Sequence, residues 1–80
     1  MKVTVSFFMF SALAGTSESE LELPEGAAVA ALAGVLKEQF AGIFPHAERA
    51  IYLVNGQTST RETPLKEGDR VLMLQILGGG

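Results

Sequence analysis

The C-terminal stretch Val71-Leu72-Met73-Leu74-Gln75-Ile76-Leu77-Gly78-Gly79-Gly80 decides the fold. Its first seven residues are mostly apolar and predict a strand, in which side chains alternate between the two faces of a sheet. Val71 and Met73 would point one way, while Leu72, Leu74 and Ile76 would point the other. A strand with aliphatic side chains on both faces belongs in the middle of a sheet, where each face is covered or meets a partner.

A first strand is predicted at the amino end, over residues 2–10. Apolar and polar residues alternate there, so that every second residue from Val3 to Phe7 faces the core. Phe8 and Phe10 would then lie on the opposite face, beside the outward aliphatic side chains of the last strand.

A second strand over residues 18–23 and a helix over residues 27–41 follow. Glutamates alternate with leucines in the strand, and a charged outer face is typical of an edge strand. Apolar residues recur at steps of three and four in the helix, which indicates one buried stripe. Gly26 is the best candidate for the N-cap, and Gly42 for a left-handed stop.

The dipeptide Asn55-Gly56 is a strong hairpin signal between strands over residues 49–54 and 57–60. Leu65 is the apolar anchor expected in the connection that leads to the last strand. The order of elements predicts an α+β fold, with a mixed sheet of four to five strands and one main helix on one face.

One helix cannot cover both faces of that sheet. The uncovered face would carry an apolar patch, and such patches usually mark a protein interface. We therefore predict a folded domain over residues 1–77, a thin glycine tail over residues 78–80, and a partner-binding patch made of Phe8, Phe10, Leu72, Leu74 and Ile76.

The composition narrows the possible partners. Six lysines and arginines stand against nine aspartates and glutamates, and a net charge of −3 argues against nucleic acid as the main partner. There is no cysteine for a disulfide or thiolate site, and the single histidine and the scattered glutamates lack metal-ligand spacing. No resident metal or cofactor is expected.

The amino end imitates a short signal peptide, with Lys2 before an apolar run and Ala12-Leu13-Ala14 as a cleavage site. Thr4 and Ser6 interrupt that run, and the alternation suits a first strand better. No apolar run approaches the roughly 18 to 20 residues of a membrane span. These features predict a cytoplasmic protein without membrane contact.

Several segments together resemble a known family. They are Phe7-Phe8, Leu13-Ala14-Gly15, Val54-Asn55-Gly56, the run from Pro64 to Val71, and the final Gly79-Gly80. The chain resembles the ubiquitin-like sulfur carriers of the MoaD and ThiS type, namely the small subunit of molybdopterin synthase and the thiamine-pathway carrier. The resemblance implies a ubiquitin-like β-grasp fold.

Two departures keep the pathway open. Ser11-Ala12 stand where small subunits of molybdopterin synthase often carry an Arg-Glu pair, and residues 74–78 look closer to the thiamine carrier. The length and the first strand favour molybdopterin synthase. The basic residues that precede the diglycine of ubiquitin are missing, which disfavours a protein-conjugation tag.

The resemblance implies a role for the chain's own end. A carboxylate is an anion and a poor electrophile at neutral pH, so the Gly80 carboxylate must first be activated. A ubiquitin-activating-type enzyme (MoeB/ThiF-like) would adenylate it with ATP, and sulfur would then displace AMP to leave a thiocarboxylate. Leu77, Gly78 and Gly79 would extend into the channel of a partner, either the large subunit of molybdopterin synthase (MoaE-like) or thiazole synthase.

Three alternatives stay open from the sequence. The chain could donate sulfur to thiamine or another product, it could be a protein modifier joined to lysine through Gly80, or it could be an interaction domain with an inert tail.

The predicted tail is long enough to reach a partner. Three or four extended residues span roughly 10 to 14 Å, enough to enter a neighbouring active site.

Overall fold

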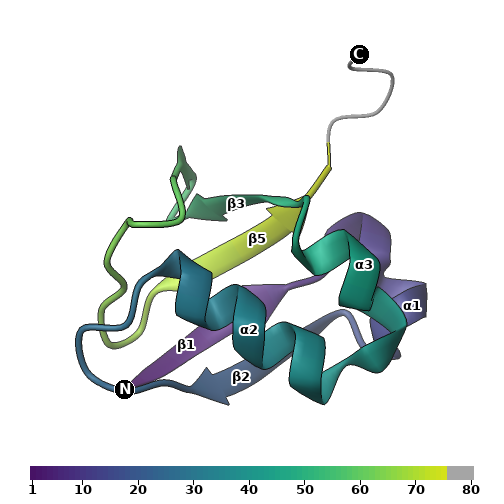
Figure 1. Cartoon of the computed structure of the whole chain (residues 1–80), viewed down its shortest axis with the longest axis horizontal. Helices are drawn as coiled ribbons and strands as arrows, with labels where there is room; N and C mark the ends of the chain where they lie inside the picture. The colour runs from purple at the N-terminus through teal and green to yellow at the C-terminus, as the bar shows by residue number, and fades with distance from the viewer. Residues whose placement is uncertain (76–80) are drawn as a thin grey trace.

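A mixed sheet forms the centre of the computed structural model of this chain, which describes residues 1–75 except for the Phe44 side chain. Within these residues the sheet has five strands in the order β2-β1-β5-β3-β4 (Figure 1). β5 pairs in parallel with β1 and antiparallel with β3, so the prediction that the last strand is central is confirmed. The bounds are β1 Lys2–Ser6, β2 Glu18–Glu22, β3 Ile51–Val54, β4 Gln57–Thr58 and β5 Arg70–Leu74.

The helix α2, Val29–Gln39, crosses one face of this sheet and covers the core (Figure 1). Its buried stripe is the one that the spacing predicts, and it packs against the inward side chains of the strands. Full burial of each such aliphatic side chain contributes about 1.5–3 kcal/mol. Leu65 is buried as the predicted anchor. The core also includes Val3, Val5, Leu21, Leu32, Leu36, Tyr52, Val71 and Met73.

The amino end of α2 is capped by backbone rather than by a side chain. The N-cap residue is Ala28, which has extended backbone and makes no side-chain capping bond. The Val29 N–H donates to the Thr63 carbonyl (3.0 Å) and the Ala30 N–H to the Arg61 carbonyl (2.9 Å). The prediction that Gly26 caps the helix is therefore wrong, because a distant loop satisfies the free N–H groups.

The first strand ends earlier than the alternation predicts. After Ser6 the chain turns into the 3-10 helix η1, Phe8–Phe10, and the short helix α1, Ser11–Ala14. The Phe7 N–H donates to the Ser17 carbonyl (2.9 Å), and Phe8 adopts a positive φ of 44°. This turn carries Phe10 into the core, where it is 5% exposed and its ring lies 5.1 Å from that of His46.

Two further helical segments follow α2: η2, Ala41–Ile43, and α3, Phe44–Ala47. Gly42 is not in the left-handed conformation that we predicted for a helix stop. A Cβ atom at this position would instead lie 2.4 Å from the Leu13 carbonyl oxygen. Glycine is required here because α1 approaches the η2 backbone closely.

These short helices gather at the end of the sheet where β1 and β5 end (Figure 1). The opposite face of the sheet from α2 is the open one. None of the helices in the described part of the chain has the length and hydrophobicity that a membrane span needs.

Candidate functional site

The open face of the sheet carries a row of aliphatic side chains. On β5, Val71 and Met73 are buried in the core, whereas Leu72 and Leu74 are only half-buried, which confirms the predicted alternation. Leu53 of β3 lies directly opposite Leu72. Ile51 lies opposite Leu74 in the same ladder. We call Ile51, Leu53, Leu72 and Leu74 the outer aliphatic patch.

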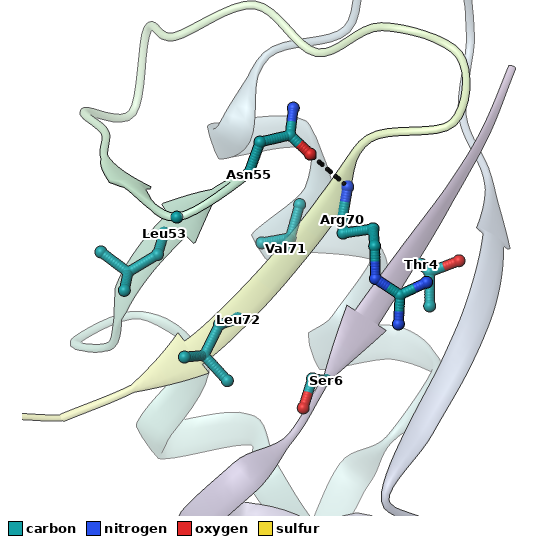
Figure 2. A pocket seen from close by; sticks show the side chains of 8 residues that line it. Thr4, Ser6, Leu53, Asn55, Arg70, Val71 and Leu72 are labelled. Atoms are coloured by element: carbon teal, nitrogen blue, oxygen red, sulfur yellow. Dashed lines mark hydrogen bonds between the residues drawn. The ribbon is translucent and has the colours of Figure 1, made fainter.

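A cavity of about 330 Å³ opens on this face beside the patch (Figure 2). Leu53 and Leu72 supply its apolar lining, while Arg70 and two hydroxyl side chains of β1 make its lining partly polar. A cavity of this size and lining can accept one or two apolar side chains of a partner protein. The lining residues are Thr4, Ser6, Leu53, Asn55, Gly56, Arg70, Val71 and Leu72.

A hydrogen-bonded clamp fixes one wall of the cavity. The Arg70 N–H donates to Asn55 Oδ1 (3.0 Å), as Figure 2 shows, and Asn55 Nδ2 donates to Asp69 Oδ1 (2.9 Å). The other carboxylate oxygen of Asp69 accepts the Lys66 N–H (2.8 Å). Asp69 is only 5% exposed. The clamp therefore ties the β3–β4 hairpin to the start of β5 through a satisfied buried carboxylate.

Charge lies at the edge of the site. The Arg70 side chain is largely exposed and pairs with Glu18 at 3.4 Å across β1. An exposed pair of this kind contributes about 0–1 kcal/mol. Arg70 is therefore available to exchange Glu18 for a carboxylate of a partner.

Three exposed hydrophobic residues lie in η1 and α1, close in sequence to the contact between η1 and β5. The segment η1 packs against β5, and Met9 Sδ accepts a hydrogen bond from the Gln75 N–H (3.2 Å). Phe8 is 64% exposed, Met9 40% and Leu13 50%. A positive φ at phenylalanine costs about 1–3 kcal/mol, and such strain tends to persist at functional sites. We call Phe8, Met9 and Leu13 the apolar rim.

The predicted partner-binding residues are placed as follows. Leu72 and Leu74 lie on the open face, and Phe8 lies in the apolar rim rather than on a strand. Phe10 is in the core, so its predicted place on the open face is wrong, because the chain leaves the sheet after Ser6. Ile76, Leu77, Gly78, Gly79 and Gly80 lie outside the described residues.

Sequence reasoning missed part of this site. The sequence shows that Ile51 and Leu53 alternate with Tyr52 and Val54. Only the register of β3 against β5 shows that Ile51 and Leu53 lie on the open face. Met9 gave no local signal, since its position depends on a contact with the distant Gln75.

Tyr52 lies on the inner face and takes no part in the open site. Its hydroxyl donates to the Ala47 carbonyl (2.7 Å), and burial raises the pKa of Tyr52 to about 12. Among residues 1–75 there is no group of three or more histidine, cysteine, aspartate or glutamate side chains placed to hold a metal ion.

Comparison with known proteins places the chain in a family. The sequence model of the ThiS family matches residues 7–80. No curated protein sequence matches the chain significantly. The putative molybdopterin converting factor subunit 1 from Pyrococcus furiosus is 32% identical, with a TM-score of 0.84 over 92% of this chain and 95% of that one.

Two further structures share the fold at lower identity. The modifier protein SAMP1 from Haloferax volcanii has a TM-score of 0.87 at 15% identity, with both chains fully covered. Subunit 1 of the molybdopterin-converting factor from Helicobacter pylori, solved in complex with subunit 2, has a TM-score of 0.72 at 23% identity, again with full coverage. The chain therefore has the ubiquitin-like β-grasp fold and belongs to the ThiS family of sulfur-carrier-type proteins.

Proposed function

We propose that this protein carries sulfur as a thiocarboxylate on Gly80 and delivers it as the small subunit of a molybdopterin-synthase-like complex. The observation that carries the proposal is the family match over residues 7–80, which includes the terminal glycines that follow a central strand. The putative molybdopterin converting factor subunit 1, at 32% identity and a TM-score of 0.84, supports the choice of this pathway.

The chemistry needs an activating enzyme and ATP. An oxygen of the Gly80 carboxylate attacks the α-phosphorus of ATP, pyrophosphate leaves, and an acyl adenylate forms. A hydrosulfide ion then adds to the carbonyl carbon and AMP leaves, so that a terminal oxygen has been exchanged for sulfur. The carrier supplies the reacting carbonyl and its position, whereas the activating enzyme holds the ATP.

The open face of the sheet is the docking surface in this proposal. The outer aliphatic patch and the apolar rim contact the partner, and a partner side chain enters the cavity between Leu53 and Leu72. Docking of the folded body raises the effective concentration of the C-terminal residues at the partner's active site. Leu77, Gly78 and Gly79 then occupy a channel that is narrow because glycine has no Cβ.

The partner is a subunit 2 of the molybdopterin-converting type. The Helicobacter pylori subunit 1, which shares this fold, was solved in complex with subunit 2. Arg70 at the margin of the cavity and the outer aliphatic patch favour a partner surface that is apolar with a carboxylate at its edge.

Two alternatives have specific support. The matching family model is named for ThiS, which favours thiazole synthase as the acceptor of sulfur. The fold of the modifier SAMP1 is equally compatible with conjugation of Gly80 to lysine, which would appear as high-mass adducts in cells.

ATP–pyrophosphate exchange tests the activation step. The chain is incubated with the ubiquitin-activating-type enzyme of its source organism, ATP and labelled pyrophosphate. We expect exchange with the natural chain and none with a chain extended by one residue after Gly80, because the extension removes the carboxylate from its reacting position. Circular dichroism checks that the extended chain is folded. Equal exchange with both chains would show that Gly80 is not the group activated.

A further inference from the structure

Met9 has an unusual position for a methionine. It lies in the strained η1 turn, is 40% exposed, and its sulfur accepts a hydrogen bond from the backbone N–H of Gln75. Gln75 follows the last residue of β5 and directly precedes the five C-terminal residues. The thioether of a partly exposed methionine therefore contacts the backbone where the C-terminal segment begins.

The other two methionines of the chain are in different surroundings. Met73 is 0% exposed and lies in the centre of the core. Met1 is half-buried, and its N-terminal amine donates to the Leu23 carbonyl (2.7 Å). Oxidation of methionine follows the exposure of the sulfur, so the fold distinguishes Met9 from Met73.

We propose that Met9 is a reversible oxidation site at which a hydroperoxide changes the start of the C-terminal segment. The Met9 sulfur attacks one peroxide oxygen, the O–O bond breaks, and the departing hydroxide or alkoxide takes up a proton. The sulfur is oxidised by two electrons to the sulfoxide, and the peroxide is reduced to water or an alcohol. A methionine sulfoxide reductase with a thiol reductant reverses the step.

The sulfoxide changes the contact with Gln75 in two ways. A thioether sulfur is a weak acceptor, whereas the sulfoxide oxygen is a strong one that stands away from the former position of the sulfur. The Gln75 N–H must follow the oxygen or lose its partner, and either change alters the contact between η1 and the end of β5. The sulfoxide also places a polar group in the apolar rim formed with Phe8 and Leu13.

The functional consequence rests on the proposed function, because it concerns the activation of Gly80. A displaced start of the C-terminal segment presents the carboxylate less often in the reacting geometry. We expect oxidation of Met9 to lower the rate of adenylation roughly fivefold, equivalent to about 1 kcal/mol.

Peptide mass spectrometry tests the site itself without any activity. The folded chain is treated with hydrogen peroxide, and the oxidised fraction of each methionine is followed over time. Met73 reacts only through opening of the core, so Met9 should be oxidised at least about tenfold faster. In urea the two rates should become similar. Equal rates in the folded chain would overturn the proposal.

The functional effect is tested by the ratio of adenylation rates after and before peroxide. In the natural chain this ratio should fall and then recover with the sulfoxide reductase, whereas in Met9→Leu, which has no sulfur at this position, it should stay the same. An equal fall in Met9→Leu, or no fall in the natural chain at full Met9 oxidation, would overturn the proposed effect. Lack of any adenylation before peroxide would instead contradict the proposed function.

One precaution follows from the chemistry of both proposals. The addition of oxygen to Met9 and the exchange of oxygen for sulfur at Gly80 change the nominal mass by the same amount. Fragment ions that separate the N-terminal from the C-terminal part of the chain distinguish the two modifications.

Discussion

The two faces of β5 differ sharply although their residues alternate in one strand. Val71 and Met73 are buried under α2, while Leu72 and Leu74 remain half-buried on a face that no helix among residues 1–75 covers. All four side chains are apolar, and the two pairs differ in burial only because a helix covers one face of the sheet. Hydrophobicity on the inner face stabilises the fold, and on the outer face we assign it to binding.

The largest expected effect is on the inner face. Met73→Ala leaves a cavity in the centre of the core and should lower the free energy of unfolding by about 2–5 kcal/mol. Leu72→Ala, one position away, should lower it by only about 1 kcal/mol because Leu72 is half-buried. Urea denaturation measures both. Equal losses would remove the distinction between the faces.

The pH dependence of stability offers a second way to examine the inner face. Burial raises the pKa of Tyr52 from 10.0 to about 12, so between these values the unfolded chain ionises Tyr52 while the folded chain keeps it neutral. The contribution of the neutral Tyr52 side chain to the free energy of unfolding is therefore fully present below pH 10. It is lost as the pH rises from 10 to about 12, by up to about 3 kcal/mol for a shift of this size. Denaturation curves of Tyr52→Phe should lack this part of the fall. The same alkaline loss in Tyr52→Phe would show that Tyr52 does not cause it.

A third test concerns the glycines of the helical layer. Gly42→Ala would place its Cβ 2.4 Å from the Leu13 carbonyl, and the required shift should lower stability by about 1–3 kcal/mol. Gly34→Ala in the middle of α2 is the matched control. Apart from the backbone of its own helix and its chain neighbours, no atom lies within 4 Å of that Cβ, so helix propensity should raise stability by about 1 kcal/mol. Thermal unfolding measures the stability of both variants. If both substitutions changed stability in the same direction, the close approach of α1 to η2 would be contradicted.

The last test concerns binding by the outer face. Leu72→Ala should weaken the complex with subunit 2 about tenfold, equivalent to about 1.4 kcal/mol, because it removes an apolar contact at the cavity. Glu38→Ala, an exposed position on α2 across the sheet from the patch, is the control and should bind as the natural chain does. Isothermal titration calorimetry measures both affinities. Tight binding by Leu72→Ala would place the interface elsewhere.

The sequence was sufficient for the parts of the fold that depend on periodicity. Aliphatic residues on both faces of the last strand predicted its central position, and steps of three and four predicted α2. Contacts between distant segments could not be predicted in this way. The carbonyls of Arg61 and Thr63 cap α2, and Leu13 determines why residue 42 is glycine.

The candidate site shows the same division. The alternation placed Leu72 and Leu74 on the open face, but it also extended the first strand past Ser6 and so put Phe10 on the wrong side. The hydrogen bond from Phe7 to Ser17 and the positive φ of Phe8 end the alternation there, and neither is visible in the order of apolar residues. The cavity required the register of β3 against β5.

The most direct test of the whole account is the location of sulfur after activation. The chain is incubated with its activating enzyme, ATP and a sulfur source, and its C-terminal fragment is then sequenced by tandem mass spectrometry. We predict one oxygen exchanged for sulfur on Gly80, only when ATP is present. As a positive control, the same enzyme preparation is given a carrier protein that it is known to modify. If that carrier gains sulfur while the C-terminal fragment of this chain stays unchanged, the account is contradicted.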